Sequence, residues 1–143
     1  MNQESKKAPN DRWRWENLRG PVVFLGLTGV AGAAALWVGI SDNVPGVALL
    51  YLASTSLVLA FAHRLRRVKS FVILLVASLL GFFVAGLLHN LLYGLGQMAG
   101  EIAVVTPVLE ALHVAFFLAA LLLCPAGVLV GGAGSLIAWR RAR

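Results

Sequence analysis

Charged side chains are scarce in this chain. Asp, Glu, Lys and Arg together make up 13% of its 143 residues, while 59% of the residues are hydrophobic. A soluble domain with so few charges would be unusual. The apolar residues also fall in blocks of about twenty, which is the length that an α-helix needs to cross a bilayer. We therefore expect one membrane domain and no separate soluble domain.

Groups that carry chemistry are also sparse. Cys124 is the single cysteine, which excludes an internal disulfide and a cysteine-only metal cluster. The sequence contains no glycine-rich phosphate loop, no evident nucleophile with its base and no pair of carboxylates that suggests hydrolysis, so it does not favour an enzyme. The net charge of +6 comes from basic residues that flank the apolar blocks. That distribution is typical of membrane topology signals and does not indicate a nucleic-acid partner.

Four apolar blocks predict the fold class: an all-α, polytopic integral membrane protein, built as a four-transmembrane-helix bundle with a kinked fourth helix. The expected spans are residues 21–40, 47–63, 71–92 and 107–139, between a polar N-terminal tail (1–20) and a basic C-terminal tail (140–143). The segments expected to connect the spans are a turn at 41–46, a basic linker at 63–69 and a loop at 94–105.

Prolines mark several of these boundaries. Pro21 is expected in the first turn of the first span, where its missing N–H would have been unpaired anyway. Pro107 is expected to open the fourth helix, with Thr106 as its N-cap. Within that helix, Pro125 cannot donate the hydrogen bond that the carbonyl of Leu121 would accept. The sequence therefore predicts a bend next to Pro125 and a freed carbonyl at Leu121.

The basic residues predict the orientation in the membrane. All twelve Lys and Arg lie in the N-terminal tail, the linker or the C-terminal tail, and four spans put these three segments on one side. By the positive-inside rule both termini are expected in the cytoplasm, with the chain in a plasma or inner membrane. The linker side chains are expected to contact anionic lipid headgroups on that cytoplasmic side. They are Arg64, Arg66, Arg67 and Lys69.

Small residues form stripes on the third and fourth spans. Gly81 and Ala85 are one helical turn apart on the third span, and Gly127, Gly131 and Ser135 have the same spacing on the fourth. Such repeats let two helix backbones approach closely in a membrane. We therefore expect close helix packing within the chain, and contacts with other membrane subunits or with a second copy.

Polar and ionisable side chains gather near one end of the predicted bundle. His89 lies near the end of the third span, Glu110 and His113 lie near the start of the fourth, and Tyr51 lies on the second. Each is on the face of its helix that carries small or polar residues, so we expect the four side chains to converge. Ionisable groups are costly inside a membrane, and such a cluster is a functional hypothesis.

Four interpretations of this cluster are open. It can be a hydrogen-bonded cluster that sets the register of the helices. It can be a divalent metal site, since Glu110-x-x-His113 puts two ligands on adjacent turns and His89 would be the third. It can hold haem b between His89 and His113. It can also be a proton relay or a path for a small solute.

The leading functional hypothesis is non-catalytic. A small integral membrane protein with two close-packing stripes is expected to act by helix packing, as a subunit or accessory protein of a membrane complex or as a homo-oligomer. The first alternative is a metal- or haem-binding membrane protein centred on His89, Glu110 and His113. The second alternative is a small transporter or channel.

Overall fold

The chain is all-α in a computed structural model that describes residues 11–41, 43–99 and 104–143, with side chains described from Arg19 onward. The helices are α1 (Asp11–Val38), α2 (Val44–Ala62), α3 (Val68–Ala99), α4 (Val105–Leu118), the π-helical turn η1 (Ala119–Leu123) and α5 (Cys124–Arg141). α4, η1 and α5 form one continuous helix of 37 residues, which we call the rod. The described part of the chain therefore has four helices long and apolar enough to cross a membrane. This confirms the predicted fold class.

The first two helices form a hairpin with a tight turn. Gly39 ends α1 in the left-handed region, with φ of 88°, a conformation that costs glycine little. The side chain of Asn43 donates a hydrogen bond of 2.9 Å to the carbonyl of Val38. A Cβ on Gly46 would collide with the carbonyl of Gly39. Both glycines are therefore needed where the two helices meet.

Helix boundaries differ from the predicted ones in the first half of the chain. α1 begins at Asp11 and contains Pro21 in its interior, and its apolar part, Arg19–Val38, lies close to the predicted span at 21–40. The carbonyl that Pro21 leaves unpaired belongs to residue 17, in the polar stretch of the helix, where water can bond it. α2 begins at Val44, with Pro45 in its first turn, so the predicted turn at 41–46 is shorter than expected. Residues 1–10 of the predicted tail lie outside the described residues.

The loop predicted at 94–105 is largely helical. α3 continues through Gly94 and Gly96 to Ala99, although glycine costs about 1 kcal/mol relative to alanine inside a helix. Contact with α4 offsets that cost, since Gly96 faces Leu109. α4 then begins at Val105, with Val104 as its N-cap, so Thr106 is inside the helix and is not the predicted cap. Residues 100–103 of the predicted loop lie outside the described residues.

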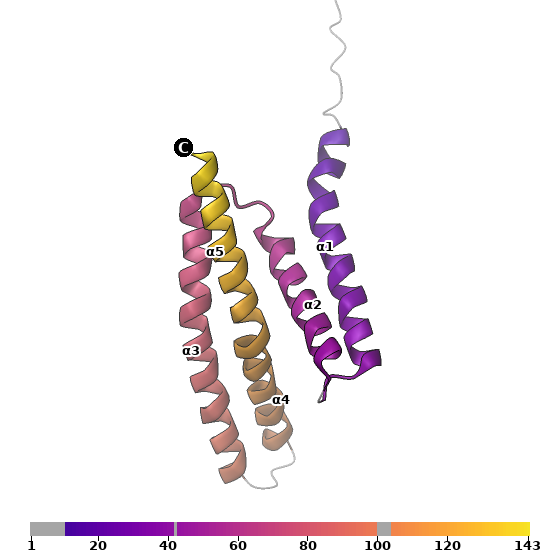
Figure 1. Cartoon of the computed structure of the whole chain (residues 1–143). Helices are drawn as coiled ribbons and strands as arrows, with labels where there is room; N and C mark the ends of the chain where they lie inside the picture. Colours follow the sequence, from indigo (N-terminus) through magenta and orange to yellow (C-terminus); the bar gives the residue numbers. More distant parts are fainter. Residues whose placement is uncertain (1–10, 42, 100–103) are drawn as a thin grey trace, which may run out of the picture.

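The four long helices form two hairpins, and these pack on each other through α2 of the first and η1 and α5 of the second (Figure 1). In the described chain α1 packs on α2 alone, and α2 packs in turn on η1 and α5. α3 packs along the whole rod formed by α4, η1 and α5. α1 starts, and α5 ends, at the same end of the molecule as the linker between α2 and α3. We call this end the basic end; it also carries the described lysine and arginine residues.

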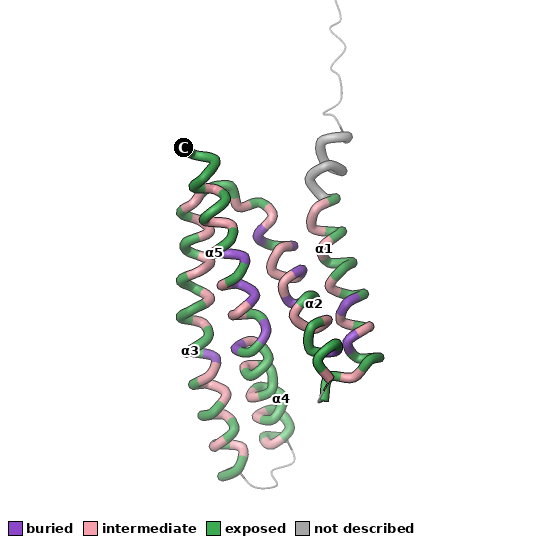
Figure 2. The backbone as a smooth tube through the Cα atoms, viewed as in Figure 1, coloured by how far each residue is buried: buried purple, intermediate pink, exposed green. Residues whose placement is uncertain are grey.

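Burial in this structure is limited to small side chains along the lines where helices meet (Figure 2). The buried hydrophobic residues are nearly all alanines, with Leu122 and Val130 as the larger exceptions. Ser54 and Ser56 of α2 are also buried. Small residues let helix backbones approach closely, which is how helices associate in a bilayer, where apolar side chains gain little by leaving lipid.

Candidate functional site

Two histidines come together between α3 and α4. The ring centroids of His89 and His113 are 5.4 Å apart. Phe117 lies 5.1 Å from His89, and Tyr93 lies 5.6 Å from His113. We call these four residues the histidine cluster. The sequence analysis placed His89 and His113 on facing helices at similar depth, and the structure brings them into contact.

A directional hydrogen bond orders this cluster. Nδ1 of His89 lies 2.9 Å from the backbone carbonyl oxygen of His113. A carbonyl oxygen can only accept, so Nδ1 of His89 carries the proton and donates it. In the neutral ring, Nε2 of His89 is then left with a free lone pair, and that nitrogen can accept a proton or bind a metal. The bond thus sets both the orientation and the tautomer of His89.

Glu110 is close to His113 but does not complete a metal site. Glu110 is exposed and lines a cavity of about 90 Å³ with His113, Tyr93 and Gln97. In the chain as described, no three His, Cys, Asp or Glu side chains are close enough to hold a metal ion. His89, Glu110 and His113 therefore do not form the three-ligand set that the metal hypothesis requires in this arrangement. The haem hypothesis stays a prediction.

Tyr51 was expected in the same cluster and is found elsewhere. Its hydroxyl donates a hydrogen bond of 3.0 Å to the carbonyl of Leu121, in the π-helical turn. Leu121 lies eight residues after His113, which is about 12 Å along a helix. In a regular α-helix the carbonyl of Leu121 is also the carbonyl that would lose its donor, because Pro125 has no N–H. We call Tyr51, Leu121 and Pro125 the proline turn.

A π-helical turn, Ala119–Leu123, directly precedes Cys124 and Pro125, where the sequence predicted a bend. The N–H of Cys124 bonds the carbonyl of Ala119, five residues before it. π-helical turns of this kind are rare and often mark functional positions. Here the turn allows a residue of another helix, Tyr51 of α2, to bond a backbone carbonyl of the rod. It therefore ties the first hairpin to the second.

Glycines of α5, two of them from the predicted stripe, pack closely against α3. A Cβ on Gly127 would collide with the side chain of Ser78, and a Cβ on Gly131 would lie 2.7 Å from the backbone nitrogen of Leu75. A Cβ on Gly134 would collide with the ring of Phe71. We call these three pairs the glycine contact. No side chain fits at these positions unless the two backbones or their side chains shift.

The other stripe residues take different places. Gly81 faces the sulfur of Cys124 at ordinary contact distance. Ala85 is the buried residue of α3. Ser135 donates a hydrogen bond of 2.8 Å to the carbonyl of Gly132 within its own helix. Ser135 is thus satisfied locally and does not bond another helix through this hydroxyl.

The basic linker lies at the end of the molecule where the chain also terminates. Arg64, Arg66, Arg67 and Lys69 are all exposed there, between α2 and the first turn of α3. At the same end, the guanidinium of Arg143 lies 3.7 Å from the ring centre of Trp139. These side chains are free to reach the headgroup layer of a membrane.

Comparison of the chain with family models, with curated proteins and with solved structures finds no match.

Sequence reasoning missed one member of the site and misplaced another. Tyr93 is one helical turn after His89 on the same face of α3, but it lay beyond the predicted span and was not considered. The freed carbonyl of Leu121 was foreseen, but its donor was not. A search of the second span for hydroxyl groups at the depth of Pro125 would have suggested Tyr51.

Proposed function

We propose that this chain is a non-catalytic integral membrane protein that acts by lateral helix packing, with a second copy of the same chain as its partner. The observation that carries this proposal is the position of α1, which has α2 as its sole neighbour in the described chain. A helix that spans the membrane with one neighbour presents most of its surface to the bilayer and to other helices there.

The uncovered face of α1 has the composition of a helix–helix interface. Gly26, Gly29 and Ala33 share one sector of the helix, and all three are exposed. A Cβ on either glycine would meet nothing within 4 Å, unlike the glycines that pack α3 on α5. Close approach of two α1 helices is thus sterically open, and the one-sided distribution of basic residues orients both copies alike.

The test is the mass of the full-length protein in mild detergent, combined with cross-linking in vesicles. The wild type is expected to be a dimer, and Gly29→Leu is expected to weaken the dimer at least about tenfold, because the leucine separates the two helices. Gly86→Leu is the matched control, since a Cβ there also meets nothing but lies on α3. A monomeric wild type, or a dimer insensitive to Gly29→Leu, would overturn the proposal.

A second candidate function is the binding of haem at the histidine cluster. It is favoured by the free Nε2 of His89, which the bond from Nδ1 orients, an arrangement common among ligating histidines. The absorption spectrum and metal content of gently purified protein test it. A cofactor that His89→Phe removes would support this function, and a colourless, metal-free wild type would contradict it.

The membrane orientation is also part of the proposal: both termini lie in the cytoplasm. Ser41→Cys and Ser70→Cys, each in a Cys124→Ala background, mark opposite ends of the molecule. In intact cells an impermeant thiol reagent is expected to label the cysteine at 41 and not the one at 70. Labelling of position 70 alone would reverse the orientation.

A further inference from the structure

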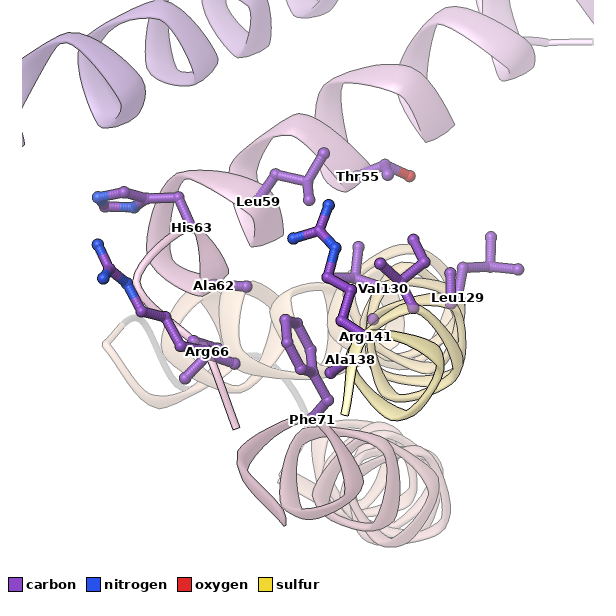
Figure 3. Close-up of a pocket in the computed structure, with 14 residues that line it drawn as sticks. Thr55, Leu59, Ala62, His63, Arg66, Phe71, Leu129, Val130, Ala138 and Arg141 are labelled. Atoms are coloured by element: carbon purple, nitrogen blue, oxygen red, sulfur yellow. The ribbon is translucent and has the colours of Figure 1, made fainter. Parts of the chain in front are cut away.

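A cavity of about 860 Å³ opens at the basic end, between the two hairpins (Figure 3). It lies between the end of α2, the linker that follows α2, the start of α3 and the end of α5. Its volume is within the range of pockets that hold small molecules. It is separate from the histidine cluster, which is at the opposite end of the second hairpin, and from the outer face of α1.

The walls of the cavity are apolar. Leu59 of α2, Phe71 of α3 and Val130 of α5 line it from three sides. The ring of Phe71 lies against Gly134, where a Cβ would collide with it, so the glycine contact sets the position of this wall. Inside a membrane such a space is filled by hydrocarbon, because water has few polar partners there.

Three lining residues at the basic end carry basic side chains. His63, Arg66 and Arg141 line the cavity, and Figure 3 shows Arg141 reaching from α5 toward α2. Among the side chains that the structure describes, Glu110 at the opposite end is the only carboxylate. Arginine binds phosphate with two parallel hydrogen bonds, so this rim is complementary to a phosphate group.

We propose that the cavity binds one anionic phospholipid of the leaflet at the basic end. The phosphate is held by Arg66 and Arg141, and an acyl chain lies against Leu59, Phe71 and Val130. Both halves of the site are needed for this assignment: a soluble anion would not use the apolar walls, and an uncharged lipid would not use the two arginines. Arg66 lies in the linker between α2 and α3, and Arg141 is the last residue of α5, so both are at the depth of lipid headgroups, which matches a lipid in its ordinary orientation.

The test is a titration of the full-length protein in detergent with dioleoyl phosphatidylglycerol, followed by native mass spectrometry. We expect one tightly bound phosphatidylglycerol per chain, weaker binding of dioleoyl phosphatidylcholine with the same acyl chains, and no competition from inorganic phosphate. The double variant Arg66→Gln/Arg141→Gln is expected to lower the affinity for phosphatidylglycerol about thirtyfold, at roughly 1 kcal/mol for each arginine.

The matched control is Arg140→Gln/Arg143→Gln. It removes the same charge from the basic end, but neither residue lines the cavity, so a change of less than about threefold is expected. Ala133→Phe, which places a ring in the cavity without a change of charge, is expected to weaken the binding of both lipids. Equal losses in the two double variants would overturn the proposal in favour of surface charge alone. Displacement of the lipid by inorganic phosphate would overturn it in favour of a soluble anion.

Discussion

The second hairpin has two halves that hold the same pair of helices together by opposite means. Toward the basic end, α3 and α5 meet through the glycine contact, where glycines of α5 make room for the backbone of Leu75 and for the side chains of Ser78 and Phe71. Toward the other end, α3 and α4 meet through the histidine cluster, where rings fill the space between the helices. The π-helical turn lies between the two halves.

This difference predicts which half of the hairpin tolerates substitutions. At Gly131 the nearest atoms are backbone atoms of Leu75, so an added side chain there must move a whole helix. Contact between rings depends on shape and on one hydrogen bond, so a substitute of similar shape loses only that bond. The glycine contact should therefore control the stability of the fold, while the histidine cluster should control the relative rotation of α3 and α4.

The largest loss of stability is expected from a substitution at Gly131. Gly131→Leu should lower the free energy of unfolding in detergent by at least about 3 kcal/mol, because its Cβ would lie 2.7 Å from the backbone nitrogen of Leu75. Gly132→Leu is the matched control: it is the next residue, and a Cβ there meets nothing within 4 Å. Thermal unfolding followed by circular dichroism measures both. Similar melting temperatures for the two variants would show that α3 and α5 do not touch at Gly131.

Substitutions at the π-helical turn, between the two halves, should give an intermediate loss of stability. Tyr51→Phe leaves the carbonyl of Leu121 without its donor inside the membrane, which costs about 1–2 kcal/mol. Pro125→Ala restores an N–H to the rod, and in that background Tyr51→Phe should cost less than about 0.5 kcal/mol. The measurement is a double-mutant cycle on stability. If the two changes are additive, the hydroxyl of Tyr51 does not replace the donor that Pro125 lacks.

The smallest losses of stability are expected in the histidine cluster, and they should differ between the two histidines. His89→Phe removes the donor of the hydrogen bond and should cost about 1 kcal/mol. His113→Phe keeps the acceptor, which is a backbone carbonyl, and should cost less than about 0.5 kcal/mol. Chemical denaturation of each variant in detergent tests this order. A larger loss for His113→Phe would mean that its side chain has a partner beyond the ring contacts described.

The number of spans and their approximate places follow from the sequence alone, because crossing a bilayer requires a run of apolar residues of fixed length whatever the helices pack against. The gathering of basic residues at one end follows in the same way, since four spans return the chain to that side. The freed carbonyl of Leu121 is equally local, because the ring of Pro125 removes a donor within one helical turn.

Contacts between distant residues were decided by the tertiary structure. Helix α3 runs on through Gly96, which faces Leu109 of α4, and no local preference of glycine indicates this. The hydroxyl of Tyr51 reaches Leu121, and Arg66 lines the same cavity as Arg141, because η1 and α5 pack on α2 and not on α1. Local sequence specifies which backbone groups lack a partner and which faces are small or basic. The choice among the available partners depends on the order of helices across the membrane, which is set by the sum of many weak contacts between segments far apart in the chain.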